Sequence, residues 1–264
     1  MLKKITFTLF VLVTVLMCAS LTVADLVTDG LVAYWSLDAN TISGSDVKDV
    51  VGGNNGTITG NLVQVTGKVN GALEFDGASS VDVVGTDALN FNGKSEMTVA
   101  VWVKPASDDP VIGVVAGCCG SIVAQRDALS WALRYDGRNA GQEFEFIVCP
   151  NWQGDGGFGA PKIATGEWHY VTVVVAVDKR QLYLDGALVI EDVYAGPMVS
   201  NGPETDIGHA SDGGFVGIID EVVIYNKALT ADQVMQNFQS AGLVVSSVSL
   251  QGKLATAWGQ IKSK

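Results

Sequence analysis

The 264-residue sequence predicts an all-β protein, a two-sheet antiparallel jelly-roll sandwich that ends in one short helix. Three observations favour this fold class. Short segments rich in Val, Ile, Tyr, Phe and Trp recur along the chain, turns rich in Gly, Asn and Asp separate them, and no helical pattern occurs before Thr230. Many short strands with turns between them are typical of sandwiches and jelly rolls, whereas strands that alternate with helices indicate a parallel sheet.

The predicted strands follow the period-two pattern of β-structure. Between Met97 and Lys104, the side chains of Val99, Val101 and Val103 share one face, because successive residues of a strand point to opposite faces. The most apolar segment, 171–177, carries hydrophobic residues at both sets of positions, which predicts a strand covered on both faces. The other expected strands are 31–38, 71–76, 80–84, 121–125, 131–135, 143–148 and the two halves of 181–189.

Two Asp-Gly pairs are strong turn signals. Asp76-Gly77 and Asp185-Gly186 each lie between segments of strand-like sequence. Because this dipeptide favours the two-residue turns that connect antiparallel strands, both pairs predict β-hairpins.

The C-terminal helix has a clear start. Thr230 is a good N-cap residue, and Gln233 follows three positions later, which forms a capping box. Val234, Met235 and Phe238 supply an apolar stripe at helical spacing. We therefore expect a short helix that packs against the end of the sandwich.

The N-terminal 24 residues are typical of a secretory signal peptide. Lys3 and Lys4 precede an apolar run over 5–17, and small residues before Asp25 offer a cleavage site. The run is shorter than the roughly 20 residues that span a bilayer, although a membrane anchor stays an alternative. We expect a secreted, periplasmic or cell-surface protein without a stable membrane span after cleavage, with one domain over 25–243 and a basic C-terminal tail over 244–264.

The charge balance excludes one class of partner. The chain has 16 Lys and Arg against 28 Asp and Glu, and loss of the signal peptide would remove only Lys3 and Lys4, which leaves a net charge of −14. A surface this acidic repels phosphate backbones, so we expect no nucleic acid partner. It is compatible with cations and with neutral sugars.

Three cysteines remain after removal of the signal peptide. They are Cys118, Cys119 and Cys149, and we expect the first two to lie in a long loop over 106–121. Outside the cytoplasm, one disulfide between Cys149 and either Cys118 or Cys119 is expected, and three free buried thiols are the alternative.

Five segments, taken in order, resemble the laminin-G-like family of the concanavalin A-like lectin/glucanase superfamily, in its bacterial secreted form. Each is loosely defined, but five in the right order are specific, and together they cover about 30–241. The resemblance implies a jelly roll, often with one structural calcium ion, that recognises glycans or other extracellular ligands. The segments are GLVAYWSLD (30–38), LEFDG (73–77), GEWHYV (166–171), LYLDG (182–186) and GIIDEVVIYNKAL (217–229).

Asp220 is the leading candidate for a metal ligand. It lies within an apolar strand, where a bare carboxylate is costly to bury. The resemblance implies that Asp38, Asp220 and a backbone carbonyl at or near Gly77 share one calcium ion, with Asp76 as a further candidate. The alternatives are a hydrogen-bonded turn acid for Asp220 and a hairpin residue for Asp76.

A ligand surface is expected on the outward face of a sheet and in a nearby loop. Trp152 and Phe158 lie in the Gly-rich loop over 151–160, and exposed loop aromatics are good binding candidates. Trp152 could instead cover the edge of the sandwich. The outward positions expected to line the surface are Arg134, Glu143, Glu145 and Tyr183.

The sequence gives little support for catalysis. Glu143 and Glu145 would lie on one solvated strand face about 7 Å apart, a separation that glycoside hydrolysis can use. However, the three-acid motif of the glucanase branch is missing, and two distant histidines and three cysteines form no metal or nucleophile set. We therefore expect a non-catalytic, calcium-binding recognition module for a glycan or an extracellular protein. The alternatives are a protein-interaction domain without a sugar site and a glycoside hydrolase-like enzyme.

Overall fold

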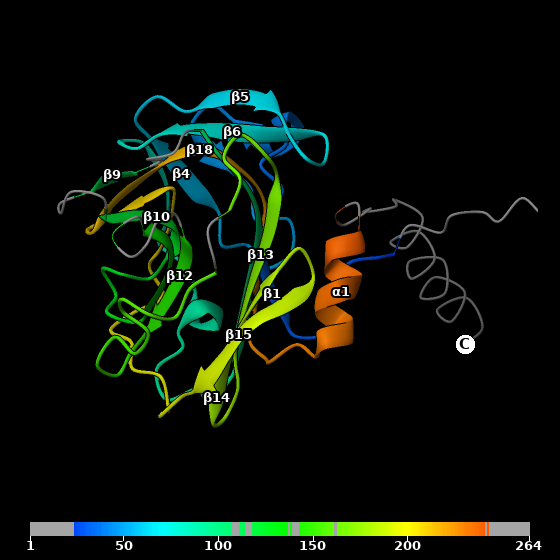
Figure 1. Ribbon diagram of the computed structural model, residues 1–264. Coiled ribbons are helices and arrows are strands. Elements are labelled where there is room, and N and C mark those ends of the chain that lie inside the picture. Colours follow the sequence, from blue (N-terminus) through cyan, green and yellow to red (C-terminus); the bar gives the residue numbers. More distant parts are fainter. Residues whose placement is uncertain are drawn as a thin grey trace, which may run out of the picture.

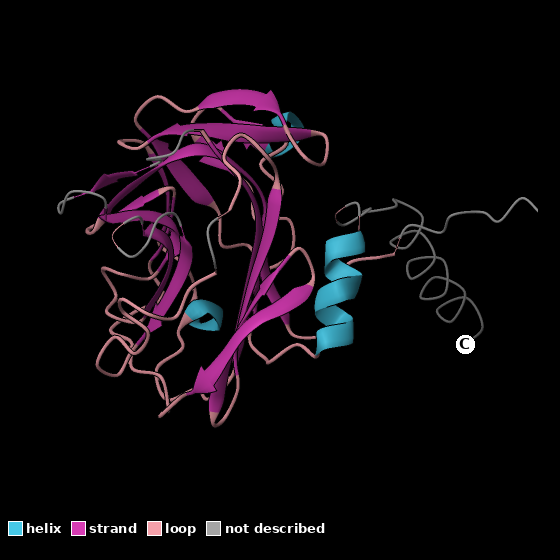
Figure 2. Cartoon of the chain, viewed as in Figure 1, coloured by secondary structure: helices cyan, strands magenta, loops and turns pink. Residues whose placement is uncertain are grey.

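The computed structural model describes residues 24–106, 111–113, 118–136, 138, 143–160, 163–240 and 242. The predicted signal peptide, except Ala24, and the predicted tail over 244–264 lie outside this part. Within it, two β-sheets face each other, and one α-helix, α1 (Ala231–Gln239), covers the outer face of one sheet (Figures 1 and 2). The predicted jelly-roll sandwich with one short C-terminal helix is confirmed.

The helix-covered sheet, called sheet I, is antiparallel. Its long central strand is β18 (Gly213–Tyr225), which pairs along one edge with β8 (Met97–Pro105). The opposite edge of β18 pairs first with β6 (Gly71–Asp76) and then with β1 (Leu31–Trp35). The remaining strands are β5 (Val63–Thr66) beside β6, and β13 (His169–Val175), β14 (Lys179–Leu184) and β15 (Ala187–Val193) beyond β8.

The second sheet, called sheet II, connects to sheet I through β18. The first residues of β18 pair with β9 (Val111–Gly113) and β17 (His209–Ala210), and the rest continue into sheet I. The strands of sheet II lie in the order β2 (Ile42–Ser43), β3 (Asp46–Val47), β4 (Gly56–Thr59), β7 (Ser80–Val83), β16 (Thr205–Ile207), β10 (Cys118–Ala124), β11 (Trp131–Asp136) and β12 (Glu143–Val148). Two 3-10 turns, Ala39–Thr41 and Asp87–Leu89, complete the elements.

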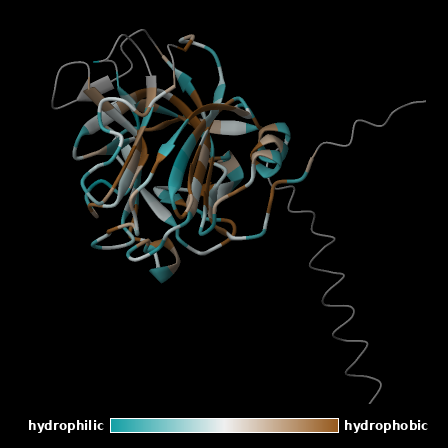
Figure 3. Ribbon diagram, turned by 60° about the horizontal axis from the view of Figure 1, so that its bottom comes forward, coloured by the Kyte–Doolittle hydropathy of each residue, from teal (hydrophilic) through white to brown (hydrophobic). Residues whose placement is uncertain are grey.

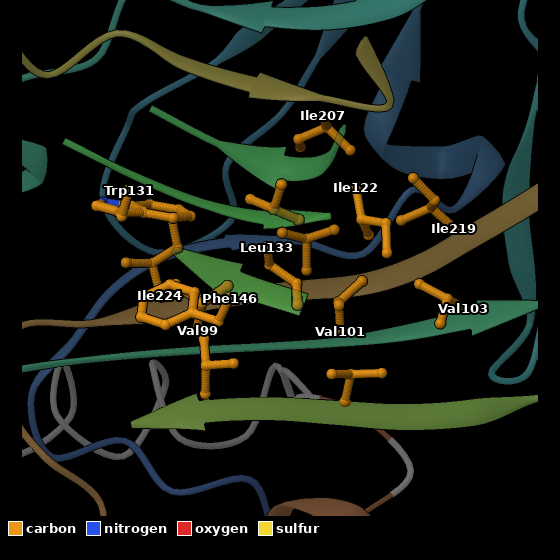
Figure 4. Close-up of a cluster of buried hydrophobic side chains, with 14 of the residues drawn as sticks. Val99, Val101, Val103, Ile122, Trp131, Leu133, Phe146, Ile207, Ile219 and Ile224 are labelled. Carbon is orange, nitrogen blue, oxygen red and sulfur yellow. The ribbon is translucent and has the colours of Figure 1, made fainter. Parts of the chain in front are cut away.

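The hydrophobic core fills the space between the two sheets (Figure 4). Val99, Val101 and Val103 face this core from sheet I, as their alternation predicts, and each is fully buried. Figure 3 shows hydrophobic segments running through the interior, whereas several peripheral loops are hydrophilic. From sheet II, the core receives Ile122, Trp131, Leu133, Phe146 and Ile207, among others.

The two Asp-Gly pairs serve different turns. Asp185 and Gly186 both have positive φ angles, 52° and 81°, and connect β14 to β15 as the predicted hairpin. The hairpin predicted at Asp76-Gly77 is wrong, because β6 belongs to sheet I and β7 to sheet II. Gly77, with φ 79°, turns the chain between the sheets, and Asp76 Oδ1 accepts hydrogen bonds from the N–H groups of Ala78 and Ser79, at 2.9 and 2.8 Å.

The helix begins as predicted but packs elsewhere. The Thr230 hydroxyl accepts the Gln233 N–H, and the Gln233 side chain accepts the Thr230 N–H, which confirms the capping box. Phe238 contacts the rings of Trp102 and Tyr170, with centroids 5.6 and 6.1 Å apart. The helix therefore lies across the outer face of sheet I and not at the end of the sandwich, because this face carries aromatic residues that need a cover.

The two ends of the described chain meet beside this helix. Ala24 forms a parallel β-bridge with Ser240, and the Val27 N–H donates to Asn237 Oδ1 at 2.9 Å. The described residues contain no helix that is long and apolar enough to cross a membrane.

The predicted pairing of Cys149 is wrong. Cys118 and Cys119 begin β10, where a loop was expected, and are bonded to each other, whereas Cys149 is buried with a free thiol. Cys149 follows the last residue of β12, and Cys118 pairs with the far end of β11. A pairing would need the two Cα atoms within about 7 Å, which these positions do not allow.

Candidate functional site

A cluster of acids occupies a break in sheet I. The strands β6 and β1 pair with successive parts of one edge of β18, and Asp220 and Glu221 lie opposite the gap between them. Asp38, three residues after β1, closes the gap, because its carboxylate accepts the N–H of Gly71, the first residue of β6, at 2.8 Å. The structure therefore brings Asp38 to the part of β18 that holds Asp220.

A β-bulge places both acids of β18 on one face. The register with β8 shifts between Asp220 and Val223, and Glu221 has φ 53°, in the left-handed region. In a regular strand, consecutive side chains point to opposite faces, but an extra residue breaks this alternation. Asp220 lies opposite Trp102, and Glu221 contacts Tyr34, so both carboxylates lie on the outer face of sheet I. Non-glycine residues in this conformation concentrate at functional sites.

Both carboxylates are buried, and in each of them only one of the two oxygens accepts a hydrogen bond from the described residues. Asp220 Oδ2 accepts the N–H groups of Lys68 and Val69 at 2.8 and 2.9 Å, and Glu221 Oε2 accepts the Tyr34 hydroxyl. Asp220 Oδ1 and Glu221 Oε1 are buried without a hydrogen-bond partner among the described residues. A buried carboxylate oxygen without a partner is costly, so both atoms need a proton or a cation.

The electrostatics of the two carboxylates also indicate that they need a proton or a cation. Burial raises the pKa of Asp220 to about 7 and the pKa of Glu221 to about 8, and repulsion by neighbouring carboxylates, including Asp38, adds to both shifts. Within the described part, none of the three acids forms an ion pair with Lys, Arg or His.

The oxygen donors fit a hard cation such as Ca²⁺. Asp38 lies near enough to Asp220 and Glu221 to raise the pKa of both, although the carboxylate oxygens of the three acids do not all lie within 4.8 Å of one another. The pocket of about 390 Å³ beside Asp38 and Glu221 adds polar residues such as Ser36 and Asn40. Calcium takes six to eight oxygen ligands, whereas zinc prefers nitrogen and sulfur. Gly67 lets the neighbouring loop approach, because a Cβ there would lie 2.6 Å from Asp220 Oδ2.

The structure divides the four residues expected at the metal site. Asp38 and Asp220 come together, but Asp76 and Gly77 lie at the opposite end of β6, about 16 Å from Gly71 along the strand. Asp76 caps its own turn there. Glu221 was missed, although two acids in succession within an apolar strand were a usable signal.

A second site lies on the outward face of sheet II. Leu133 and Phe146 point into the core, so Arg134 and Glu145, which lie directly opposite each other on β11 and β12, point outward. They lie beside a pocket of about 250 Å³, here called the arginine pocket. Its lining residues are Cys118, Cys119, Arg126, Arg134, Arg138, Asp155, Ser211 and Asp212.

Arg134 is the centre of this pocket. It is 3% exposed, and its guanidinium donates to Glu145 at 2.7 Å, to Asp212 at 3.2 Å and to Asp155 at 2.5 Å. A planar guanidinium with several donors can hold three carboxylates at once. The burial of this charge is therefore compensated by ion pairs.

Two further arginines form the rim. Arg126 Nε donates to Asp212 at 2.6 Å, and its guanidinium lies over the Trp152 ring, 3.8 Å from the centroid. Arg138 pairs with Asp136 at 2.5 Å and with Asp155 at 3.2 Å. Positive and negative groups therefore alternate around the pocket.

The strand pattern predicted that Glu145 lies on a solvated face, but in the structure its side chain is buried. It is fully buried, because the loop that carries Asp155 and Gly156 folds over it, and its Oε1 accepts the Gly156 N–H at 2.5 Å. Burial raises the pKa of Glu145 to about 7, and Arg134 opposes this shift. Both oxygens of Glu145 accept hydrogen bonds from the protein, Oε2 from Arg134 and Oε1 from Gly156.

The other expected ligand-binding residues are dispersed. Trp152 is half-buried and packs on a small apolar cluster of sheet II, so it covers this sheet beneath Arg126. Tyr183 is buried on the outer face of sheet I, away from the arginine pocket, because β14 belongs to that sheet. Phe158 is 1% exposed in the core, and Glu143 begins β12 with a side chain outside the described structure. Arg126, Arg138, Asp155 and Asp212 were missed, because they come from separate turns without a common pattern.

The family comparison identifies the class of protein. A laminin G family model, described as the concanavalin A-like lectin/glucanases superfamily, matches residues 75–235. The chain therefore belongs to this family, as the five segments indicated. No curated protein sequence matches the chain.

Solved structures share the fold at low sequence identity. Domain 4 of AbnA, an extracellular arabinanase from Geobacillus stearothermophilus solved with arabinotriose, has a TM-score of 0.60 and 21% identity, over 78% of this chain and 97% of that one. The binding domain of botulinum neurotoxin DC, solved with rat synaptotagmin II, has a TM-score of 0.59 and 14% identity, over 81% and 52%. Trypanosoma rangeli sialidase, solved with 2,3-difluorosialic acid, has a TM-score of 0.56 and 15% identity, over 82% and 34%.

Proposed function

We propose that this protein is a secreted, non-catalytic carbohydrate-binding module that holds one calcium ion. The arginine pocket carries the proposal, because its charged side chains are fixed by ion pairs and hydrogen bonds before any ligand arrives. Planar polar groups held in advance in this way bind sugar hydroxyls at low entropic cost. The arabinotriose complex of a domain with the same fold supports this assignment.

The proposal includes a structural role for calcium. Asp38, Asp220 and Glu221 would hold the ion in the break of sheet I, where two buried carboxylate oxygens lack partners. The bound charge would compensate the buried acids and fix the loop that donates to Asp220. This site lies on sheet I and the arginine pocket on sheet II, so the ion would support the fold and not contact the sugar.

The absence of catalysis is also part of the proposal. Glu145 donates no proton to a ligand in this arrangement, because Arg134 and Gly156 occupy its two oxygens. Asp136 is similarly held by Arg138. Incubation with arabinans, β-glucans and sialylated oligosaccharides should release no new reducing ends or sialic acid.

The proposed function is tested on a glycan array that includes arabino-oligosaccharides, followed by titration of each hit. We expect binding by the wild-type protein and at least a tenfold loss for Arg126→Ala, because this side chain lines the pocket and is 22% exposed. Trp168→Ala is the control, since it removes a partly buried tryptophan that packs on the opposite sheet. Uniformly blank arrays from folded protein would contradict the proposal and favour a protein-interaction domain.

A further inference from the structure

We propose that the arginine pocket takes an uncharged sugar unit through neighbouring hydroxyl groups and discriminates against sugars that carry a carboxylate. This inference rests on the proposed carbohydrate-binding function and names the class of sugar. Three guanidinium groups meet four carboxylates in and around the pocket, which leaves no net positive charge for an acidic ligand. The groups are Arg126, Arg134 and Arg138, and Asp136, Glu145, Asp155 and Asp212.

Each arginine already has its own counter-ion. Arg126 pairs with Asp212 at 2.6 Å, and Arg138 pairs with Asp136 at 2.5 Å. Arg134 is nearly surrounded by carboxylates.

Two carboxylates present an oxygen to a ligand. Among the described residues, Asp155 accepts hydrogen bonds only through Oδ1 and Asp212 only through Oδ2. Their side chains are 55% and 19% exposed, so the remaining oxygens can accept from a ligand. A ligand carboxylate would meet like charge at both positions, whereas a hydroxyl group can donate to either.

Donors lie beside these acceptors. Within the described part, Arg126 makes its hydrogen bond through Nε, which leaves its two terminal amino groups available at the rim. A sugar hydroxyl both donates and accepts, so two adjacent hydroxyls can connect Arg126 with Asp212, or Arg138 with Asp155. The pocket of about 250 Å³ lies just below the usual range of small-molecule sites, which fits one sugar unit.

Matched pairs of neutral and acidic sugars test the inference. The wild-type protein is titrated with arabinotriose, lactose and 3′-sialyllactose, and screened on an array of neutral glycans beside their sialylated or uronate counterparts. We expect neutral glycans to bind at least tenfold more tightly than their acidic counterparts. This comparison uses only the wild-type protein, so a substitution that disturbs folding cannot affect its result.

A charge variant then locates the discrimination. The double substitution Asp155→Asn with Asp212→Asn leaves three guanidinium groups and two carboxylates, so we expect a tenfold or greater loss for neutral glycans and a smaller or reversed preference against acidic ones. Asp192→Asn is the matched control, because Asp192 is also 55% exposed and pairs with Arg180 at 3.0 Å, on β15 of sheet I.

The outcomes separate this inference from the proposed function. If acidic glycans bind as tightly as their neutral counterparts, or if the double variant binds neutral glycans normally, the inference is overturned while carbohydrate binding stands. If folded wild-type protein binds no glycan of either kind, both are overturned.

Discussion

At the scale of single residues, Asp206 on β16 lies among other acids. Burial, together with repulsion from Asp127, Asp82 and Glu204, raises the pKa of Asp206 to about 7. The folded state therefore holds this proton at a pH where the unfolded chain has released it. The proton on Asp206 contributes fully to the free energy of unfolding below the unfolded pKa near 4, and this contribution is lost as the pH rises to about 7.

The substitution Asp206→Asn should remove this loss of stability at rising pH. We expect the variant to match the wild type at pH 4 and to exceed its free energy of unfolding by about 1 kcal/mol at pH 8, after allowance for solvent screening. Urea denaturation at both pH values measures the difference. Equal stability of the two proteins at pH 8 would contradict the prediction, and Asp192→Asn, whose pKa is lowered by Arg180, should show no such gain.

Single residues also show what the sequence could reveal. The alternation of Val99, Val101 and Val103 predicted which side faces the core, because side-chain direction in a strand is local. The same rule placed Arg134 and Glu145 outward correctly, but it could not predict their burial. The loop that folds over them is a distant part of the chain, and its contacts depend on the whole fold.

At the scale of elements, the cap of α1 is open to a direct test. Thr230→Ala removes the side chain that accepts the Gln233 N–H, so we expect a loss of about 1 kcal/mol in the free energy of unfolding. Because α1 covers the aromatic outer face of sheet I, the whole domain should lose this stability. Thermal melts should show a decrease of about 2–4 °C, and Thr230→Ser should retain the wild-type value.

Turns show the limits of prediction from sequence. The Asp-Gly pairs at 76–77 and 185–186 are equivalent as local signals, yet only the second closes a hairpin. The first turns the chain from sheet I to sheet II, since the partner of each flanking strand is decided by distant segments. The fold class followed from the sequence, because it depends on the recurring strand and turn pattern. The complete set of acids near Asp220 did not follow from it, because that set depends on which distant segments meet.

At the scale of the whole molecule, the acids in the break of sheet I predict coupling between calcium and folding. A ligand that binds only the folded state at 1,000 times its dissociation constant adds about 4 kcal/mol of stability. We expect saturating calcium to raise the melting temperature of EDTA-treated protein by about 8–16 °C. Differential scanning calorimetry with and without calcium measures this shift.

Two aspartates provide the variant and its control. Asp220→Asn should abolish the calcium-dependent shift, because it removes a buried charge from the proposed ligand set. Asp76→Asn should keep the shift, since Asp76 lies at the other end of β6 and its turn hydrogen bonds can be made by an amide oxygen. A full shift in the Asp220 variant would reject the assignment of calcium to this site.

The bridge between Ala24 and Ser240 has a practical consequence for presentation of the pocket. Both ends of the described domain emerge side by side next to α1, on sheet I, whereas the arginine pocket opens from the outward face of sheet II. Fixing the domain to a solid support next to Ala24 or next to Ser240 would orient the arginine pocket toward the surrounding medium. Immobilisation of the domain beside either of these residues should therefore leave the arginine pocket accessible to ligands.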